Sequence, residues 1–185
     1  MASQLDGKRI AFLVANQGVE QVELTSPWQA VKDAGGTPVL LAPERDKVHA
    51  VNGDINPGDT FQPDEVVSSA AAADFDALVL PGGVANPDKL RVIPEAVAFV
   101  KAFADNGKPV AAICHGPWSL VEAAVVTGKT LTSWPSLQTD IRNAGGTWVD
   151  EEVFTCSKQG FVLVTSRKPD DLDAFDKALV EAFAG

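Results

Sequence analysis

The sequence is poor in the residues that build metal sites and in positive charge. Its 185 residues include two cysteines, two histidines, one methionine and no tyrosine. The cysteines and histidines lack the spacing of zinc ligands, which argues against a structural zinc site. Lys and Arg number 15 against 25 Asp and Glu, giving a formal net charge of −10. Nucleic acids and anionic membranes are bound mainly through Lys and Arg, so both are disfavoured as partners.

Several patterns that mark other protein classes are also missing. No apolar run approaches the roughly 18 residues of a membrane-spanning helix, and residues 1–7 lack the basic start and apolar core of a signal peptide. No Gly-x-x-x-x-Gly-Lys or Gly-x-Gly-x-x-Gly motif supports nucleotide binding. We therefore expect a cytoplasmic protein with reduced cysteines and with neither cofactor nor metal.

What is present is the composition of an ordinary globular protein, with 45% hydrophobic and 22% charged residues. Neither a repeat nor a linker divides the chain, so we expect one domain over residues 1–185. Short apolar segments alternate with helix-compatible ones, which predicts an α/β sandwich with a mostly parallel sheet. Residues 43–61 are expected to form short strands or turns at the sheet edge. Strands are expected at 8–15, 37–42, 76–80, 110–113, 130–134 and 161–165, and helices at 26–34, 64–73, 94–105, 118–126, 135–143 and 169–183.

One stretch carries the strongest indication of chemistry. A buried strand at 110–113 runs directly into Cys114 and His115, and Gly116 and Pro117 then allow a tight turn and a helix start. A cysteine on such a strand-to-helix elbow is lifted from the sheet, and the positive end of the helix dipole favours its thiolate. The alternative is a small buried hydrophobic residue. The elbow favours an activated nucleophile at Cys114.

Two further strand ends could contribute to the same site, because functional residues gather beyond the carboxyl ends of parallel strands. The N–H groups of Gly82, Gly83 and His115 could form an oxyanion hole, although Pro-Gly-Gly is also a common turn. A glutamate near the thiol would have a raised pKa and could move a proton. Glu20 is preferred because it follows the first strand directly, with Glu23 as its local competitor.

The remaining candidates have weaker support. His115 is an awkward base for its own neighbour, because adjacent side chains tend to diverge, and no acid adjacent in sequence orients its ring. His49 is a possible substitute in a polar loop. Trp134, at the end of a predicted strand, could wall the pocket. Cys156 is expected to be a strand residue without chemistry.

Four segments of the chain resemble the PfpI intracellular protease and protein deglycase superfamily, which is related to class I glutamine amidotransferase domains. These segments occur in order, so the resemblance extends from about Lys8 to Phe183. The Ala-Ile-Cys-His-Gly-Pro segment is the most specific of them. The matching residues are 19–24 with Pro27, 78–83, 112–117 and 143–145.

The resemblance implies a flavodoxin-like three-layer sandwich with Cys114 as the nucleophile. It assigns the glutamate of the site to Glu20, not Glu23. It further implies that His115 is completed by an acid from a neighbouring subunit, to which Asp88 corresponds. The site would then lie at an interface of a dimer or hexamer.

Two departures from the pattern affect the site. Gln21 stands where an acid often follows the glutamate, which alters the charge beside the thiol. Trp134 stands where similar sequences often have a tyrosine, so an indole N–H replaces a titratable hydroxyl.

The function implied is that of a cysteine-dependent hydrolase or lyase in stress protection. The substrate would be a peptide, a small dicarbonyl compound or its adduct on a protein, giving a protease, a deglycase or a glyoxalase III-like enzyme. A non-catalytic redox sensor with an oxidisable Cys114 is the alternative. A pure interaction module would require this cysteine to be inert.

Overall fold

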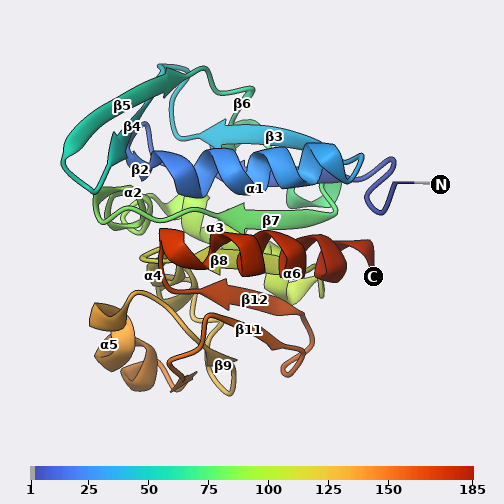
Figure 1. The fold of residues 1–185 in the computed structure, drawn as a ribbon, viewed down its shortest axis with the longest axis vertical. Helices are drawn as coiled ribbons and strands as arrows, with labels where there is room; N and C mark the ends of the chain where they lie inside the picture. Colours follow the sequence, from blue (N-terminus) through green and yellow to red (C-terminus); the bar gives the residue numbers. More distant parts are fainter. Residues whose placement is uncertain (1–2) are drawn as a thin grey trace.

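A central sheet of seven strands organises the computed structural model, which describes residues 3–185 (Figure 1). Its strands are β1 (Arg9–Leu13), β3 (Thr37–Ala42), β6 (Glu65–Val66), β7 (Ala77–Leu80), β8 (Val110–Ile113), β11 (Val153–Cys156) and β12 (Leu163–Ser166). They lie in the order β11-β12-β8-β7-β1-β3-β6, and only the β11–β12 pair is antiparallel. The mostly parallel sheet is therefore confirmed.

Helices cover both faces of this sheet, which makes the predicted three-layer sandwich. In Figure 1, α1 and α6 lie in front of the sheet, while α3 and α4 lie behind it. The helices are α1 (Gln21–Asp33), α2 (Ala85–Leu90), α3 (Pro94–Asp105), α4 (Pro117–Glu122), α5 (Gln138–Asn143) and α6 (Leu172–Ala184). Single 3₁₀ turns occupy Val67–Ser69, Ala72–Asp74, Pro135–Leu137 and Pro169–Asp171.

The apolar run of β1 shows why a strand between two helical layers needs hydrophobic residues at every position. Ile10 and Phe12 pack into the core under α1 and α6, whereas Ala11 and Leu13 pack into the core on the opposite face. Successive side chains of a strand point to opposite faces, so both sets are buried at once. This is the pattern from which the strand was predicted.

Two small sheets lie beside the main one. The first joins β2 (Gln17–Glu20), β4 (Val48–Asn52) and β5 (Asn56–Phe61), confirming the short strands expected within 43–61. The second pairs β9 (Thr130–Leu131) with β10 (Thr147–Trp148). The strand expected at 130–134 is thus shorter than predicted and outside the central sheet.

Two helix predictions need correction. The helix expected from Ser26 begins at Gln21 and continues through Pro27, held on the sheet by its buried face. Proline removes only one helical hydrogen bond, and tertiary packing of Leu24 and Val31 offsets that loss. The helix expected at 64–73 is replaced by β6 and two 3₁₀ turns. Only Val67 is buried in these two turns, so the segment has no apolar face that would hold a helix on the sheet.

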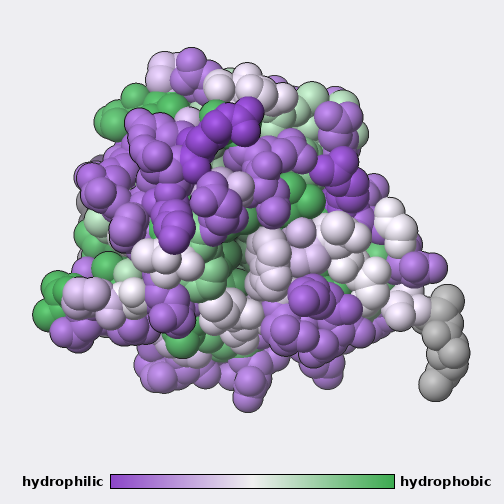
Figure 2. Space-filling view, turned by 90° about the horizontal axis from the view of Figure 1, so that it is seen from above, coloured by the Kyte–Doolittle hydropathy of each residue, from purple (hydrophilic) through white to green (hydrophobic). Residues whose placement is uncertain are grey.

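The surface seen from one side is mostly hydrophilic, as expected of a globular protein (Figure 2). Figure 2, a view from above, shows mostly hydrophilic residues with hydrophobic ones in small patches. No helix among residues 3–185 is both long and apolar enough to cross a bilayer.

Candidate active site

Cys114 sits on a strained turn between β8 and α4. Its φ of 61° lies in the left-handed region, which is costly for a residue other than glycine. The Cys114 N–H donates to Ser166 O at 3.1 Å, and the Gly116 N–H donates to Ile113 O at 2.9 Å. A Cβ on Gly116 would run into the carbonyl oxygen of Leu80, so the turn requires glycine there. The predicted nucleophile elbow is confirmed.

The sheet order brings the three expected strand ends together. β7 lies between β1 and β8, so the segments that follow these strands meet at one edge. The contact is so close that a Cβ on Gly82 would lie 2.6 Å from the Cβ of Cys114 and would collide with the carboxyl group of Glu23. The chain therefore needs glycine at this point of the Pro-Gly-Gly turn.

Glu23 is the carboxyl group beside the sulfur. It is completely buried, its Oε2 accepts the N–H of Gly82 at 2.9 Å, and it interacts with the Cys114 thiol. Burial is the main cause that raises its pKa, to about 8. Glu23 is therefore protonated at neutral pH and can donate a proton to the sulfur or to a bound substrate.

Glu20 does not lie where the sequence analysis expected it. Its two carboxylate oxygens accept the N–H groups of Gly53 at 2.9 Å and Asp54 at 3.0 Å, in the turn between β4 and β5. Glu20 precedes α1 and turns toward this hairpin, whereas Glu23, three residues later, faces the end of the sheet. The assignment of Glu20 as the carboxyl group beside the thiol is therefore corrected to Glu23.

The thiol itself is less exposed and less acidic than expected. Cys114 is 5% exposed. Burial raises the pKa of its thiol, and an ionised Glu23 adds to this, while the N–H groups of Gly83 and His115 lower it. The expectation that the helix start favours the thiolate is thus not met in this conformation, because desolvation outweighs it. The resting group is a thiol, which needs a base.

His115 is placed to be that base. Its Nδ1 lies 3.2 Å from the Cys114 sulfur, because the left-handed elbow turns two adjacent side chains toward each other. Burial lowers the pKa of His115, so its ring is neutral at neutral pH. In the tautomer with hydrogen on Nε2, Nδ1 can accept the thiol proton.

The backbone donors predicted for an oxyanion hole have separate partners. The N–H groups of Gly83 and His115 lower the pKa of the Cys114 thiol, as donors close to its sulfur do. The N–H of Gly82 is instead engaged by Glu23. Gly82 is therefore removed from the predicted donor set, and Gly83 and His115 remain.

Two tryptophans enclose the histidine. The rings of Trp134 and His115 stack with centroids 5.7 Å apart and planes 24° apart, and the Trp118 ring lies 5.1 Å away on a tilt. Trp134 is 38% exposed, and its backbone N–H donates to Cys114 O at 2.9 Å. The indole predicted as a pocket wall thus lies over the imidazole with part of its surface open to solvent.

Three other predicted residues lie outside this cluster. Asp88 is exposed on α2, and its side chain makes no hydrogen bond or ion pair with the cluster among the described residues of the chain. His49 is exposed on β4. Cys156 is buried on β11, where its sulfur accepts the N–H of Thr130 at 3.4 Å. His49 and Cys156 therefore do not contribute to the cluster.

Asn86 is a residue of the site region that the sequence analysis missed. It is completely buried, and its Nδ2 donates to the carbonyl oxygens of Pro81 at 3.0 Å and Gly82 at 3.1 Å. Its Oδ1 accepts the N–H of Ala15 at 2.6 Å. Asn86 thereby ties the end of β1 to the Pro-Gly-Gly turn. Its sequence context resembled a variable loop, which gave no signal of burial.

The raised pKa of Glu23 predicts a pH-dependent stability. Glu23 binds its proton more tightly when folded, with a pKa of about 8 against the ordinary glutamate value of 4.5. The stabilisation is complete below the unfolded value and is lost as the pH rises toward 8, by at most about 1.4 kcal/mol per pH unit. Urea unfolding at pH 5 to 9 should show this loss in the wild type and not in Glu23→Gln. Parallel curves for the two proteins would contradict it.

Among the residues described, no group of three or more His, Cys, Asp or Glu side chains is arranged to hold a metal ion. The cluster thus offers a thiol, a neutral imidazole, a protonated carboxyl group and two backbone donors. Together these can add a nucleophile to a carbonyl carbon and move the protons that the addition requires.

Comparison with known proteins identifies the family of the chain. YraA of Bacillus subtilis, named as a candidate cysteine protease, is 42% identical over 170 residues, covering 92% of this chain and 95% of the relative. Protein/nucleic acid deglycase 2 of Escherichia coli is 39% identical over 171 residues, covering 92% and 94%. The crystal structure of Drosophila melanogaster DJ-1beta superposes with a TM-score of 0.82 at 26% identity, covering 96% and 91%. The DJ-1/PfpI family model matches residues 8–182. The chain belongs to the DJ-1/PfpI family.

Proposed function

We propose that the chain is a cysteine-dependent enzyme that acts on small dicarbonyl compounds or on their adducts with proteins. The observation that carries this proposal is the buried cluster in which Cys114 meets His115 Nδ1 at 3.2 Å and a Glu23 whose pKa is raised to about 8. A thiol that is only 5% exposed suits a small carbonyl compound better than an extended peptide. The deglycase name of the Escherichia coli relative supports the same substrate class.

In the proposed first step, the thiol proton passes to Nδ1 of His115 and the sulfur adds to an aldehyde carbon. A C–S bond forms and the carbonyl π bond breaks, leaving an oxyanion that the N–H groups of Gly83 and His115 stabilise. Proton return from the imidazolium gives a hemithioacetal. Its two faces are then bounded by Glu23 and by the His115 ring.

For a dicarbonyl substrate, the next step moves hydrogen from the hemithioacetal carbon to the adjacent carbonyl carbon. Glu23 in its ionised form can accept that proton, and redelivery to the neighbouring carbon yields a thioester. Water then hydrolyses the thioester to a 2-hydroxy acid and restores the thiol. The raised pKa of Glu23 suits this role, because both of its protonation states are accessible near neutral pH.

The proposal includes a homo-oligomer of single-domain subunits in the cytoplasm, with a role in stress protection. Asp88 is exposed on α2 and is free within one chain to face another subunit. Among the residues described, no acidic side chain forms a hydrogen bond with the imidazole of His115. In a dimer or hexamer, Asp88 of the partner subunit would orient that ring. A dilution series that lowers both the molar mass and the specific activity would support this arrangement.

The function is tested with methylglyoxal, with formation of lactate as the measured product. The untreated protein should form lactate, and protein alkylated at Cys114 with iodoacetamide should not. A labelled casein substrate is the parallel assay. Hydrolysis of casein without lactate formation would replace the dicarbonyl proposal with a protease.

The second candidate is the redox sensor, which uses the same sulfur without turnover. Mass spectrometry after peroxide treatment separates the two functions. A mass gain at Cys114 in a protein that converts neither methylglyoxal nor casein would identify a sensor and overturn the enzymatic proposal.

A further inference from the structure

The turn between β4 and β5 is fastened to the start of α1. Both oxygens of the Glu20 carboxylate are used for this, on the N–H groups of Gly53 at 2.9 Å and Asp54 at 3.0 Å. Glu20 is only 7% exposed. A carboxylate that accepts two backbone N–H groups holds a turn firmly, because charge-assisted hydrogen bonds are stronger than neutral ones. The hairpin tip therefore has a fixed position relative to α1.

From this tip, the side chain of Asp54 reaches the loop of the candidate active site. Its Oδ1 accepts the N–H of Val84 at 2.8 Å. Val84 follows Gly83 in the turn that approaches Cys114, where a Cβ on Gly82 would lie 2.6 Å from the Cys114 Cβ, and the Gly83 N–H lowers the pKa of the thiol. Asp54 has a φ of 67°, so its backbone is itself held in an unfavourable conformation to make this contact.

These contacts close a ring around the donor loop. The Glu20 N–H donates to Gly82 O at 3.2 Å, the Glu20 carboxylate holds Asp54, and Asp54 holds Val84. The peptide units on both sides of Gly83 are thereby fixed to groups outside the loop. This ring fixes the direction of the Gly83 N–H together with the Asn86 side chain, which also donates to Gly82 O at 3.1 Å. The glycine alone would be free to rotate.

We propose that Asp54 is a positioning residue of the candidate active site, which holds the Gly83 N–H in the direction required to stabilise an oxyanion at Cys114. The inference rests on the proposed function for its catalytic consequence. Asp54 acts through the backbone of Val84 and does not need to touch the substrate. Glu20, which the sequence analysis placed at the sulfur, acts one step further away by holding the hairpin tip.

The charge of Asp54 supports the same placement. Burial lowers the pKa of His115, and the negative charge of Asp54 acts in the opposite direction. The same charge raises the pKa of Glu23. The groups that face the His115 ring are the Cys114 sulfur and the rings of Trp118 and Trp134. Behind Trp118 stand Arg91, over its ring, and Asp140, which accepts its indole N–H.

Two substitutions separate the hydrogen bond of Asp54 from its charge. Asp54→Gly removes the acceptor, and glycine tolerates the positive φ without strain. Asp54→Asn keeps an oxygen acceptor for Val84 and removes the charge. Asp59→Asn is the matched control, since Asp59 is an exposed carboxylate of the same hairpin that is bonded to Gln21 instead.

Asp54→Gly is expected to lower kcat for methylglyoxal by about 10-fold with KM little changed, since a displaced oxyanion donor costs transition-state stabilisation. It should also move the pH midpoint of Cys114 alkylation by iodoacetamide upward, because the Gly83 N–H no longer favours the thiolate. Asp54→Asn should retain kcat within about threefold and lower the pKa of His115 in NMR titration. With only two histidines in the chain, His49 serves as the internal reference.

The inference would be overturned if a folded Asp54→Gly protein kept the wild-type kcat and the wild-type pH midpoint of alkylation. It would also be overturned if Asp59→Asn lowered kcat as much as Asp54→Gly does. Circular dichroism and thermal unfolding of each variant establish that it is folded. Alkylation and NMR require no turnover. If the wild type converts no substrate, the proposed function fails, while the alkylation shift in Asp54→Gly still decides whether Asp54 positions the loop.

Discussion

The Cys114→Ser protein is expected to lose at least about 1,000-fold in turnover of methylglyoxal. A serine hydroxyl holds its proton far more tightly than a thiol does, and burial lowers the pKa of His115, which makes it a weak base. The 3.2 Å contact between the imidazole and position 114 therefore no longer yields a nucleophile. Steady-state kinetics of lactate formation measures the loss, and thermal unfolding shows whether the fold is retained.

Cys156→Ser is the control for this experiment. Cys156 is also a buried free cysteine, at 4% exposure, but it lies on the antiparallel edge strand β11, away from the elbow. Its variant should keep wild-type turnover. Retained activity in Cys114→Ser, or loss in Cys156→Ser alone, would show that the nucleophile is wrongly assigned.

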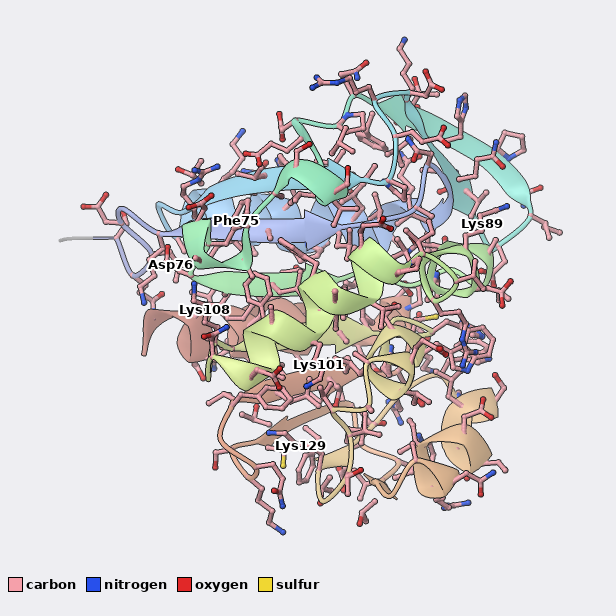
Figure 3. The ribbon with its side chains drawn as sticks, turned by 180° about the vertical axis from the view of Figure 1, so that it is seen from behind. Phe75, Asp76, Lys89, Lys101, Lys108 and Lys129 are labelled. Atoms are coloured by element: carbon pink, nitrogen blue, oxygen red, sulfur yellow. The ribbon has the colours of Figure 1, made fainter. Side chains whose placement is uncertain are left out.

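The Lys129→Met protein is expected to lose about 3 kcal/mol or more of unfolding free energy. Lys129 is completely buried (Figure 3), and its Nζ donates to the carbonyl oxygens of Cys156, Lys158 and Phe161. The ammonium also lies 3.6 Å from the centroid of the Phe161 ring. The carbonyl groups and the ring take the place of the water molecules that the ammonium loses on burial. Methionine fills similar space without a donor, so three carbonyl groups lose their partner.

Lys101→Met is the matched control, since it removes a lysine from the exposed face of α3 (Figure 3). Lys101 pairs with Asp105 at 2.7 Å, with side-chain exposures of 51% and 56%. An exposed pair of this kind contributes little, so its loss should change stability by no more than about 0.5 kcal/mol. Urea unfolding compares the two variants with the wild type. Equal midpoints for Lys129→Met and the wild type would show that the buried ammonium contributes nothing.

Much of the fold was readable from local pattern. Continuous apolar runs such as Val110–Ile113 predict a strand with both faces covered, and the structure buries all four residues of that strand. The final helix was equally clear, since Phe175, Leu179 and Phe183 recur on one helical face and are buried. The predictions failed where a local signal was outweighed, as at Pro27, which packing keeps inside α1.

The elbow that carries Cys114 was also readable, because its signal is local. A cysteine between a buried strand and a Gly-Pro helix start has few structural alternatives, and Cys114 adopts the expected elbow. The choice between Glu20 and Glu23 was different. Both come after β1 in the sequence, but Glu20 ends β2 and Glu23 lies in α1. Which one faces the sulfur depends on where α1 begins and on the hairpin that binds Glu20.

The order of residues along the chain thus determined the alternation of strands and helices and the elbow at Cys114, since each depends on neighbours within a few positions. Only the tertiary structure decided the protonated glutamate, the ring of hydrogen bonds through Asp54 and the carbonyl cage around Lys129. Those features depend on burial and on contacts between residues about 30 to 60 positions apart. Desolvation acts only once distant segments have excluded water, so no local pattern records it.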